Sequence, residues 1–326
     1  MTAECFQEIT ARYTGLRIAV VGDYSCDRYL EIDPAKKETS IETGLPVHNV
    51  THVRAQPGAA GTVLANLAAL GVGELWPVGF RGCDGEGFEL HRALEQLPGV
   101  HMKYFFESKT QRTFTYCKPL MIVRDQPPRE LNRLDTKNWH PTPEPLKKKL
   151  ANAVRTLANE VDAMIVLDQV DEPETGVVTQ NLLAVIDECK TQTLVIGDSR
   201  RGLKNWPHII YKMNADELTR FTEGDPKTAA ANLAEQTGQS VFVSMAEQGI
   251  LGAAPSGEVT HSPALFVRGE IDIVGAGDAV TANLAAALAT EAELPEVLEL
   301  ANRAASIVIH KLGTTGTASV AELHSW

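Results

Sequence analysis

Short apolar runs and longer mixed segments alternate along most of this chain. The apolar runs, rich in Val, Ile and Leu, are typical of strands buried on both faces of a parallel sheet. The expected strands span residues 16–23, 76–80, 163–167, 193–196, 209–212, 240–244 and 265–267. The expected helices span residues 63–70, 84–97, 147–160, 177–190, 215–221, 227–236 and 279–289. Because strands alternate with helices, we predict an α/β fold with a doubly wound, mostly parallel sheet flanked by helices.

Two stretches have a different texture, with short alternating pieces broken by turn residues. Residues 29–53 contain two prolines and three consecutive charges, and residues 101–106, 110–117 and 129–134 return to the same pattern. Such pieces are typical of exposed hairpins rather than of a buried sheet. We therefore expect one domain over residues 1–326, with a small β layer built from segments at about 28–55 and 100–135.

The last expected helix, residues 279–289, carries no charge and is rich in Ala and Leu, which predicts burial on nearly every side. Gly275, Ala276 and Gly277 precede it, and Asp278 stands at its start. Glycines let a ligand approach free N–H groups at a helix start, where the helix dipole favours an anion. A carboxylate beside such a site suits phosphoryl transfer to a hydroxyl. The alternative is a tight turn with Asp278 as a cap.

Composition narrows the classes of partner and compartment. The 326 residues carry 30 basic and 42 acidic side chains, a formal charge of −12. Nucleic acid and anionic membrane surfaces are therefore not expected as partners. The five cysteines are scattered, no apolar run reaches membrane-spanning length, and the first residues do not form a secretion signal. We expect a soluble protein of the cytoplasm.

Polar or glycine-rich turns follow several of the expected strands. Asn214 and Glu217 are three residues apart at a helix start, so both could face one Mg²⁺-bound water or phosphate oxygen. The alternative for this pair is a capping box. Ser244 could offer a hydroxyl to a phosphate, or it could simply be a turn residue. Ser25 and Asp27 could bind sugar hydroxyls, or they could cap the chain as it leaves the first strand.

Together these motifs resemble the ribokinase-like (phosphofructokinase B) carbohydrate kinase family over nearly the whole chain. Gly275-Ala276-Gly277-Asp278 matches its anion loop and catalytic base, Asn214 with Glu217 its Asn-x-x-Glu motif, and residues 22–27 its early sugar contact. The small β layer would then be a lid over the sugar. The segments 27–29 and 131–135 are most similar to the kinase domain of the heptose-7-phosphate kinases.

The resemblance implies an ATP- and Mg²⁺-dependent kinase acting on a sugar or sugar phosphate, with Asp278 as the base. It also implies residues that contact the nucleotide, K⁺ and the substrate. The free edges of the lid could pair in a homodimer. The implied nucleotide contacts are Asn214, Glu217, Ser244, Gly249, Asn302 and Arg200; the implied K⁺ positions are Asp272 and Val274; the implied substrate contacts are Ser25, Asp27, Gly58, Ala59, Thr62 and Arg133.

The sequence also departs from the family pattern. Ala59 and Thr62 stand where Gly-Gly-x-x-Asn has glycine and asparagine, and Ala246 stands where the nucleotide turn has glycine. Residues 168–172 are rich in acids where the heptose kinases carry a lysine. Two substrate classes stay open. Arg54, Lys118 and Arg133 favour a sugar phosphate, with Arg200 and Arg201 nearer the nucleotide, whereas the acids favour a neutral polyol, an amino sugar or a nucleoside.

Two other functions fit this sequence less well. A ligand sensor that has lost turnover would keep this fold, although an intact base and metal pair argue against it. A nicotinamide enzyme is disfavoured because the glycine loop lacks its third glycine and lies far from the first βαβ unit. A P-loop enzyme is excluded because the sequence holds no G-x-x-x-x-G-K-[ST] segment.

Overall fold

The computed structural model describes all residues, 1–326, and its centre is a nine-stranded sheet. The strand order is β16-β15-β14-β13-β12-β11-β1-β6-β7. All neighbours pair in parallel except in the pairs β14–β15 and β15–β16, which are antiparallel. The strands are β1 (Arg17–Gly22), β6 (Glu74–Gly82), β7 (Phe105–Ser108), β11 (Ala163–Asp168), β12 (Leu194–Ser199), β13 (Ile210–Asn214), β14 (Val241–Ser244), β15 (Ile250–Ala253) and β16 (Val259–Ser262).

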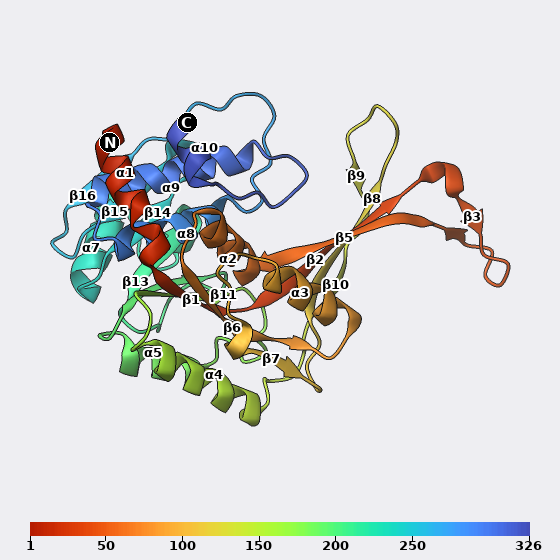
Figure 1. Cartoon of the computed structure of the whole chain (residues 1–326), viewed down its shortest axis with the longest axis horizontal. Helices are drawn as coiled ribbons and strands as arrows, with labels where there is room; N and C mark the ends of the chain where they lie inside the picture. Colours follow the sequence, from red (N-terminus) through yellow and green to blue (C-terminus); the bar gives the residue numbers. More distant parts are fainter.

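Helices cover both faces of this sheet (Figure 1). One face packs against α1 (Ala3–Ala11), α2 (Ala60–Ala69), α3 (Gly85–Glu95), α8 (Ala276–Ala289), α9 (Leu294–Ile309) and α10 (Val320–Ser325). The other packs against α4 (Glu144–Leu157), α5 (Gln180–Cys189), α6 (Ala215–Thr219) and α7 (Pro226–Thr237). Since side chains alternate along a strand, Ile18 and Val20 of β1 enter the first core, and Ala19 and Val21 enter the second. The doubly wound α/β prediction is confirmed.

A second sheet extends away from the main body as an arm (Figure 1). It contains β2 (Tyr24–Ile32), β5 (Val50–Ala59), β8 (Phe114–Met121), β9 (Arg129–Glu130) and β10 (Leu134–Thr136). The order is β10-β8-β2-β5; β2 pairs antiparallel with β5 and parallel with β8. A two-stranded ribbon, β3 (Glu38–Thr39) with β4 (Pro46–Val47), lies beyond it. We call the second sheet and this ribbon the lid.

The helix α8 is buried on nearly every side, which accounts for the many alanines in residues 276–289. Its residues 279–287 are all buried, and it packs against α2, α9 and β11. Small side chains let these elements approach on several sides at once, so the prediction of a helix buried nearly all round is confirmed. Four short 3₁₀ helices complete the fold: Tyr13–Gly15, Pro34–Lys36, Met102–Tyr104 and Ala246–Gln248.

Three sequence-based expectations about elements were wrong or incomplete. Residues 101–106 were expected in the small β layer, but β7 pairs with β6 at the edge of the large sheet. Residues 265–267 are not a strand: the side chain of Phe266 is 84% exposed and the segment has no ladder partner, while the chain forms the β15–β16 hairpin just before it. The helix α1 was not expected. None of the helices has the length and apolar character needed to span a bilayer.

Candidate active site

The loop that begins α8 lies at the carboxyl ends of the parallel strands. Gly275 is the N-cap residue of α8 and has φ 85°, a left-handed conformation that favours glycine. The N–H of Ala276 already donates to Ile273 O at 3.2 Å, whereas the N–H groups of Gly275 and Gly277 have no backbone acceptor. The N–H of Asp278 also has no backbone acceptor, so the loop has three free donors for an anion, those of Gly275, Gly277 and Asp278.

Asp278 lies in the first turn of α8, immediately after the two glycines. Burial, together with the negative charges of Asp198 and Asp27, raises the pKa of Asp278 to about 7, against the opposing positive charges of Lys212 and Arg200. The influence of Asp27 places the lid carboxylate within electrostatic reach of Asp278. A carboxyl group tuned to this range is suited to taking a proton from a hydroxyl near neutral pH.

Beneath this loop lies a buried ion pair that the sequence analysis missed. Lys212 Nζ donates to Asp198 Oδ2 at 2.7 Å, and both side chains are buried. Thr281 Oγ1, one turn into α8, also approaches Asp198 Oδ2 at 3.3 Å. A β-carbon on Gly277 would lie 3.3 Å from Lys212 Nζ, so the ammonium sits directly against the loop. In the sequence, the one sign of this ion pair is that Lys212 lies within the apolar strand that ends at Asn214.

Asn214 and Glu217 form the capping box that was the alternative for this pair. Asn214 Oδ1 accepts from the Glu217 N–H, and Glu217 Oε2 accepts from the Asn214 N–H, each at 2.8 Å. Burial raises the pKa of Glu217, with Asp198 adding to the rise and the Asn214 N–H and Lys212 opposing it. The pair presents hard oxygen atoms, so the donor chemistry fits Mg²⁺ if nucleotide phosphates and water complete the coordination. Its metal role stays a prediction.

The residues expected at the nucleotide hold the loops of that side together. Ser244 Oγ donates to Met213 O at 3.4 Å, and Gly249 has φ 95° with Ser262 O close to where a β-carbon would lie. Asn302 is buried and its Nδ2 donates to Ser262 Oγ at 3.0 Å and Pro263 O at 2.6 Å. Asn302 thus fixes the loop after β16. Ala246 has φ 49°, where the family pattern has glycine.

On the lid side, Ser25, Asp27 and Gly58 lie together. Ser25 Oγ donates to Asp27 Oδ1 at 3.2 Å, and a β-carbon at Gly58 would overlap both side chains, which explains the glycine. Lys118 Nζ lies 3.1 Å from Asp27 Oδ2 and 3.3 Å from the hydroxyl of Tyr29. A cation–carboxylate pair at this place can bind both hydroxyl and phosphate oxygens.

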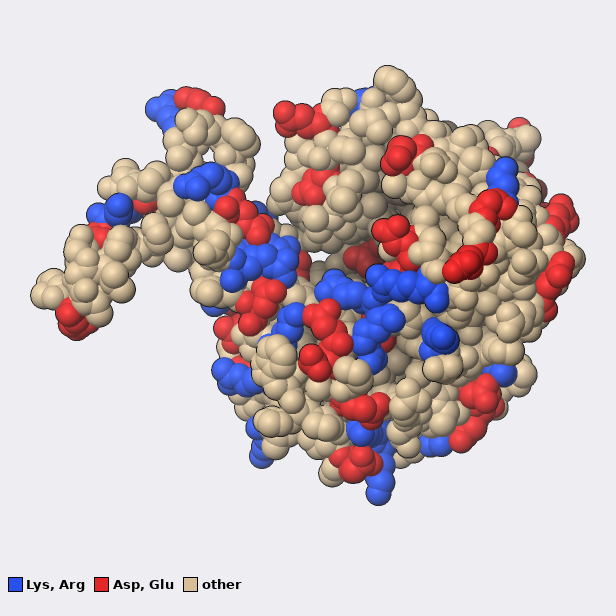
Figure 2. All heavy atoms as spheres, turned by 180° about the vertical axis from the view of Figure 1, so that it is seen from behind, with Lys and Arg blue, Asp and Glu red and all other residues tan.

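The lid carries two further arginines, Arg54 on β5 and Arg133 just before β10. Arg54 and Lys118 flank the ring of Tyr29, at 4.7 and 4.9 Å from its centroid. Arg133 lies over Tyr116 and pairs with Asp135 at 2.7 Å. Figure 2 shows Lys and Arg side chains gathered beside the hollow between the arm and the main body. The predicted substrate side therefore combines aromatic rings with cations.

The junction between lid and body is strained. Ala59, the N-cap residue of α2, has φ 54° and ψ −121°, a conformation that L-residues other than glycine rarely adopt. Thr62 in the first turn of α2 is buried, and its hydroxyl reaches Pro57 O at 3.5 Å. The two departures from the family pattern thus lie in the turn that joins β5 to α2, next to Gly58.

Two of the three acids of residues 168–172, Asp168 and Asp171, are paired with cations. Asp168 Oδ2 accepts from Ser199 Oγ and from Arg201 Nε, at 2.8 and 3.0 Å. Asp171 pairs with Lys137 at 2.5 Å and lies 3.9 Å from Arg200. Two of the three negative charges at this place are therefore neutralised by neighbours, and Glu172 has no ion pair.

A buried carboxyl group at the end of β1 was also missed. Burial and then the charge of Asp168 raise the pKa of Asp23 to about 7. Asp23 accepts from the N–H groups of Gln169 and Val177 at 2.9 and 2.7 Å, so it anchors the loop after β11. An acid directly after a buried strand was the only signal for it in the sequence.

The two positions implied for K⁺ lie just before the anion loop. Asp272 Oδ1 accepts from the Val274 N–H at 3.1 Å, and the Asp272 N–H donates to Ile309 O at 2.8 Å. This turn ties the loop to the end of α9. No group of three His, Cys, Asp or Glu side chains converges anywhere in the structure.

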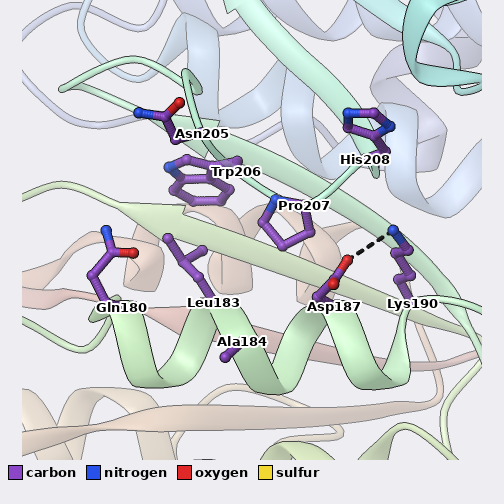
Figure 3. A pocket seen from close by; sticks show the side chains of 9 residues that line it. All are labelled: Gln180, Leu183, Ala184, Asp187, Lys190, Asn205, Trp206, Pro207 and His208. Atoms are coloured by element: carbon purple, nitrogen blue, oxygen red, sulfur yellow. Dashed lines mark ion pairs between the residues drawn. The ribbon is translucent and has the colours of Figure 1, made fainter.

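A separate shallow groove of about 460 Å³ lies over α5 and the loop before β13 (Figure 3). Its floor includes Leu183, Trp206 and Pro207, and the ion pair of Asp187 with Lys190 closes one end at 2.8 Å. None of the candidate site residues lines this groove.

The overall structure is similar to solved sugar kinases. Escherichia coli phosphofructokinase-2 in complex with substrates and products has a TM-score of 0.74 at 19% identity, with 95% of this chain and 97% of that chain covered. Arabidopsis thaliana ribokinase complexed with ribose and ATP has a TM-score of 0.68 at 19% identity, covering 95% and 99%. The large sheet, its two helical layers and the lid define a ribokinase-like fold.

Sequence comparisons give the family. The family described as pfkB family carbohydrate kinase matches residues 17–321, and the chain belongs to that family of sugar kinases. The bifunctional protein HldE of Azorhizobium caulinodans is 29% identical over 304 residues, covering 91% of this chain and 61% of that protein. HldE of Shewanella amazonensis is 30% identical over 307 residues, covering 92% and 61%. The chain therefore spans about three fifths of the length of these curated relatives.

Proposed function

We propose that this carbohydrate kinase transfers the γ-phosphoryl group of ATP, with Mg²⁺, to a hydroxyl of a phosphorylated sugar resembling a heptose phosphate. The observation that carries the proposal is the place of Asp278. It follows the two glycines whose N–H groups are free, and its pKa is about 7, raised in part by Asp27 on the lid. An acceptor hydroxyl held near Asp27 would lie within reach of Asp278.

In this mechanism Asp278 takes the hydroxyl proton as the phosphoryl group moves. The N–H groups of Gly275 and Gly277 hold phosphoryl oxygens, and the adjacent ammonium of Lys212 adds positive potential beneath them. Asn214 and Glu217 would hold Mg²⁺ through water, and the ion neutralises charge on the nucleotide phosphates when bound. Ser244, Gly249, Asn302 and Arg200 shape the nucleotide side.

The lid supports a phosphorylated acceptor. Lys118 pairs with Asp27 and, with Arg54, flanks Tyr29, so cations stand beside the predicted sugar contact. Two of the three acids that argued for a neutral substrate are countered, because Asp168 pairs with Arg201 and Asp171 with Lys137. The similarity to HldE proteins over most of the chain supports the same choice.

An ATP-consumption screen over sugars, sugar phosphates and nucleosides tests the proposal. The expected result is higher kcat/KM for a heptose or hexose phosphate than for its matched free sugar. Preference for the free sugar or a nucleoside would move the enzyme to the neutral-substrate alternative. Absence of turnover with every acceptor would favour the ligand sensor.

We also propose that K⁺ binds beside the anion loop, at Asp272 and the Val274 carbonyl. A cation there would strengthen the hold of the loop on phosphate. Rates measured in K⁺, Na⁺ and a bulky organic cation test this, with K⁺ expected to be fastest. Equal rates in all three would contradict it.

We propose further that the enzyme works in the cytoplasm, where ATP is available and its five cysteines stay reduced, as they are here. The lid offers a surface for a homodimer, because β5 is a terminal strand and Ile41 and Leu45 near the lid ribbon are exposed. Sedimentation equilibrium of the wild type and of Ile41→Asp with Leu45→Asp tests the dimer. A monomeric wild type at micromolar concentration would contradict it.

A further inference from the structure

A threonine in the loop between α9 and α10 contacts the lid. Thr315 Oγ1 accepts from Gln56 Nε2 at 2.9 Å, and the neighbouring Thr314 Oγ1 donates to Gln56 Oε1 at 3.3 Å. Gln56 lies on β5, directly opposite Asp27 in the pairing with β2. Both ends of the Gln56 carboxamide are therefore held by this loop, next to the predicted sugar contact.

The same threonine touches the anion loop. A β-carbon on Gly275 would lie 2.6 Å from Thr315 Cγ2, so the methyl group of Thr315 packs directly against the backbone of Gly275. Gly275 is the N-cap residue of α8 and is already held at φ 85°. The two ends of one side chain, a hydroxyl and a methyl, thus contact two parts of the site that come from distant segments of the chain.

The base of this loop is anchored, so its tip cannot follow the lid freely. The buried Asn66 of α2 donates to Gly316 O at 3.5 Å and accepts from the Ala318 N–H at 3.3 Å. Lys311 Nζ donates to Thr317 O at 2.6 Å. A movement of β5 that displaces Gln56 must therefore either break its hydrogen bonds to the loop or shift Thr315 against Gly275.

We propose that Thr315 is a positioning residue that couples the sugar side of the cleft to the anion loop. Its hydroxyl holds the lid through Gln56, and its methyl group holds Gly275. This proposal rests on the proposed kinase function, which identifies the two ligands as a nucleotide and a sugar. Because coupling between two sites is reciprocal, a nucleotide that orders the anion loop also stabilises β5, and a sugar that orders the lid favours the loop geometry for transfer.

Hydrogen exchange with ADP and Mg²⁺ as the probe tests this link without knowledge of the sugar. In the wild type, the amides of residues 50–59 are expected to exchange about 5-fold more slowly when ADP is bound, the lower end for coupled sites. Thr315→Val keeps the methyl group on Gly275 but loses the hydroxyl. It should bind ADP with near wild-type affinity by calorimetry, yet show no slowing in β5.

Two further variants separate the halves of the link. Thr315→Ser keeps the hydroxyl toward Gln56 and loses the methyl group toward Gly275, so it should also lose the slowing. Thr317→Val is the matched control, because only the carbonyl of Thr317 is bonded, and it should respond like the wild type. The proposal is overturned if wild-type β5 exchange ignores bound ADP, or if Thr315→Val responds like the wild type. Failure of the wild type to bind ADP would contradict the kinase itself, and this proposal with it.

Discussion

Lys212 Nζ and Asp198 Oδ2 lie 2.7 Å apart beneath the loop that carries Asp278. The two charges act on Asp278 in opposite directions: Asp198 raises its pKa and Lys212 lowers it. After burial, which is the largest cause, the pair therefore contributes to how much of Asp278 is ionised at a given pH. It also keeps a lysine charged inside a buried strand, where an ammonium without a partner would be costly.

Asp198→Asn should move the acidic limb of the kcat/KM profile to lower pH. In the proposed mechanism Asp278 acts in its ionised form, so activity should fall as the pH drops through its pKa of about 7. Removing the negative charge of Asp198 lowers that pKa, so ionised Asp278 persists to lower pH. Thr281→Val is the control, because it removes a contact to Asp198 without changing charge. An acidic limb that stays in place in Asp198→Asn would show that the pair does not tune the base.

Asp278→Asn should lower kcat by at least ~10², the lower end for loss of a general base, with little change in nucleotide affinity. The same substitution should stabilise the folded protein at alkaline pH. Folding raises the pKa of Asp278 from 3.8 to about 7, so the side chain favours the folded state fully below about pH 4, and this contribution is lost as the pH rises through 7. The neutral Asn variant should therefore gain Tm relative to the wild type more at pH 8 than at pH 5. Wild-type turnover in this variant would mean that Asp278 is only a cap.

Glu217→Gln should raise the Mg²⁺ concentration needed for half-maximal rate and depress kcat while the protein stays folded. The amide keeps an oxygen that can accept from the Asn214 N–H, so the capping box survives in part, but the negative charge toward a metal is lost. Titration of activity with Mg²⁺, together with a melting curve, measures both effects. A large fall in Tm with unchanged Mg²⁺ dependence would favour the purely structural role.

Lys118→Met should weaken a phosphorylated acceptor more than its matched free sugar. The ammonium lies 3.1 Å from Asp27, so its removal takes away a phosphate partner and leaves that carboxylate without its cation. We expect kcat/KM for the sugar phosphate to fall by at least about 10-fold, the low end for a lost charge-assisted contact. Arg133→Ala, measured beside it, tests the second lid cation. An equal loss for free and phosphorylated sugars would place the phosphate group elsewhere.

Ala59→Gly should stabilise the folded protein by about 1–3 kcal/mol, the usual cost of a residue in such a backbone region. The gain is reduced by the greater freedom of glycine in the unfolded chain, about 0.5–1 kcal/mol. Urea denaturation of the wild type and the variant measures the difference. Ala60→Gly, one position on and inside α2, is the matched control and should destabilise. A destabilised Ala59→Gly would show that the left-handed turn carries no strain.

Much of the large sheet could be predicted because its signals are local. The strands of residues 163–167 and 240–244 are apolar runs, and the uncharged helix after Asp278 had to be buried. The placement of β7 could not be predicted, because a short segment with two phenylalanines fits either sheet until its partner β6 is known. Residues 265–267 show the reverse error, an apolar run without a strand to pair with.

The candidate site was predicted in part for the same reason. Motifs that are contiguous in sequence, such as Gly275 to Asp278, can be found without a structure. The pair of Lys212 and Asp198 depends on the pairing of β12 with β13, since the two residues are 14 positions apart in sequence. Asn214 and Glu217 remained ambiguous because a capping box and a metal-binding pair require the same spacing. The contact of Thr315 with Gln56 joins residues 259 positions apart, beyond the reach of any local pattern.

The two alanines in left-handed conformations have a consequence for behaviour on heating. Ala59 lies at the predicted sugar side and Ala246 at the predicted nucleotide side, and both turns store backbone strain in the native state. Strained surface turns open at lower free energy than the core they border. As the temperature rises, both rims of the cleft should therefore loosen while the sheet and α8 remain intact, and catalysis should be lost, reversibly, several degrees before the chain unfolds.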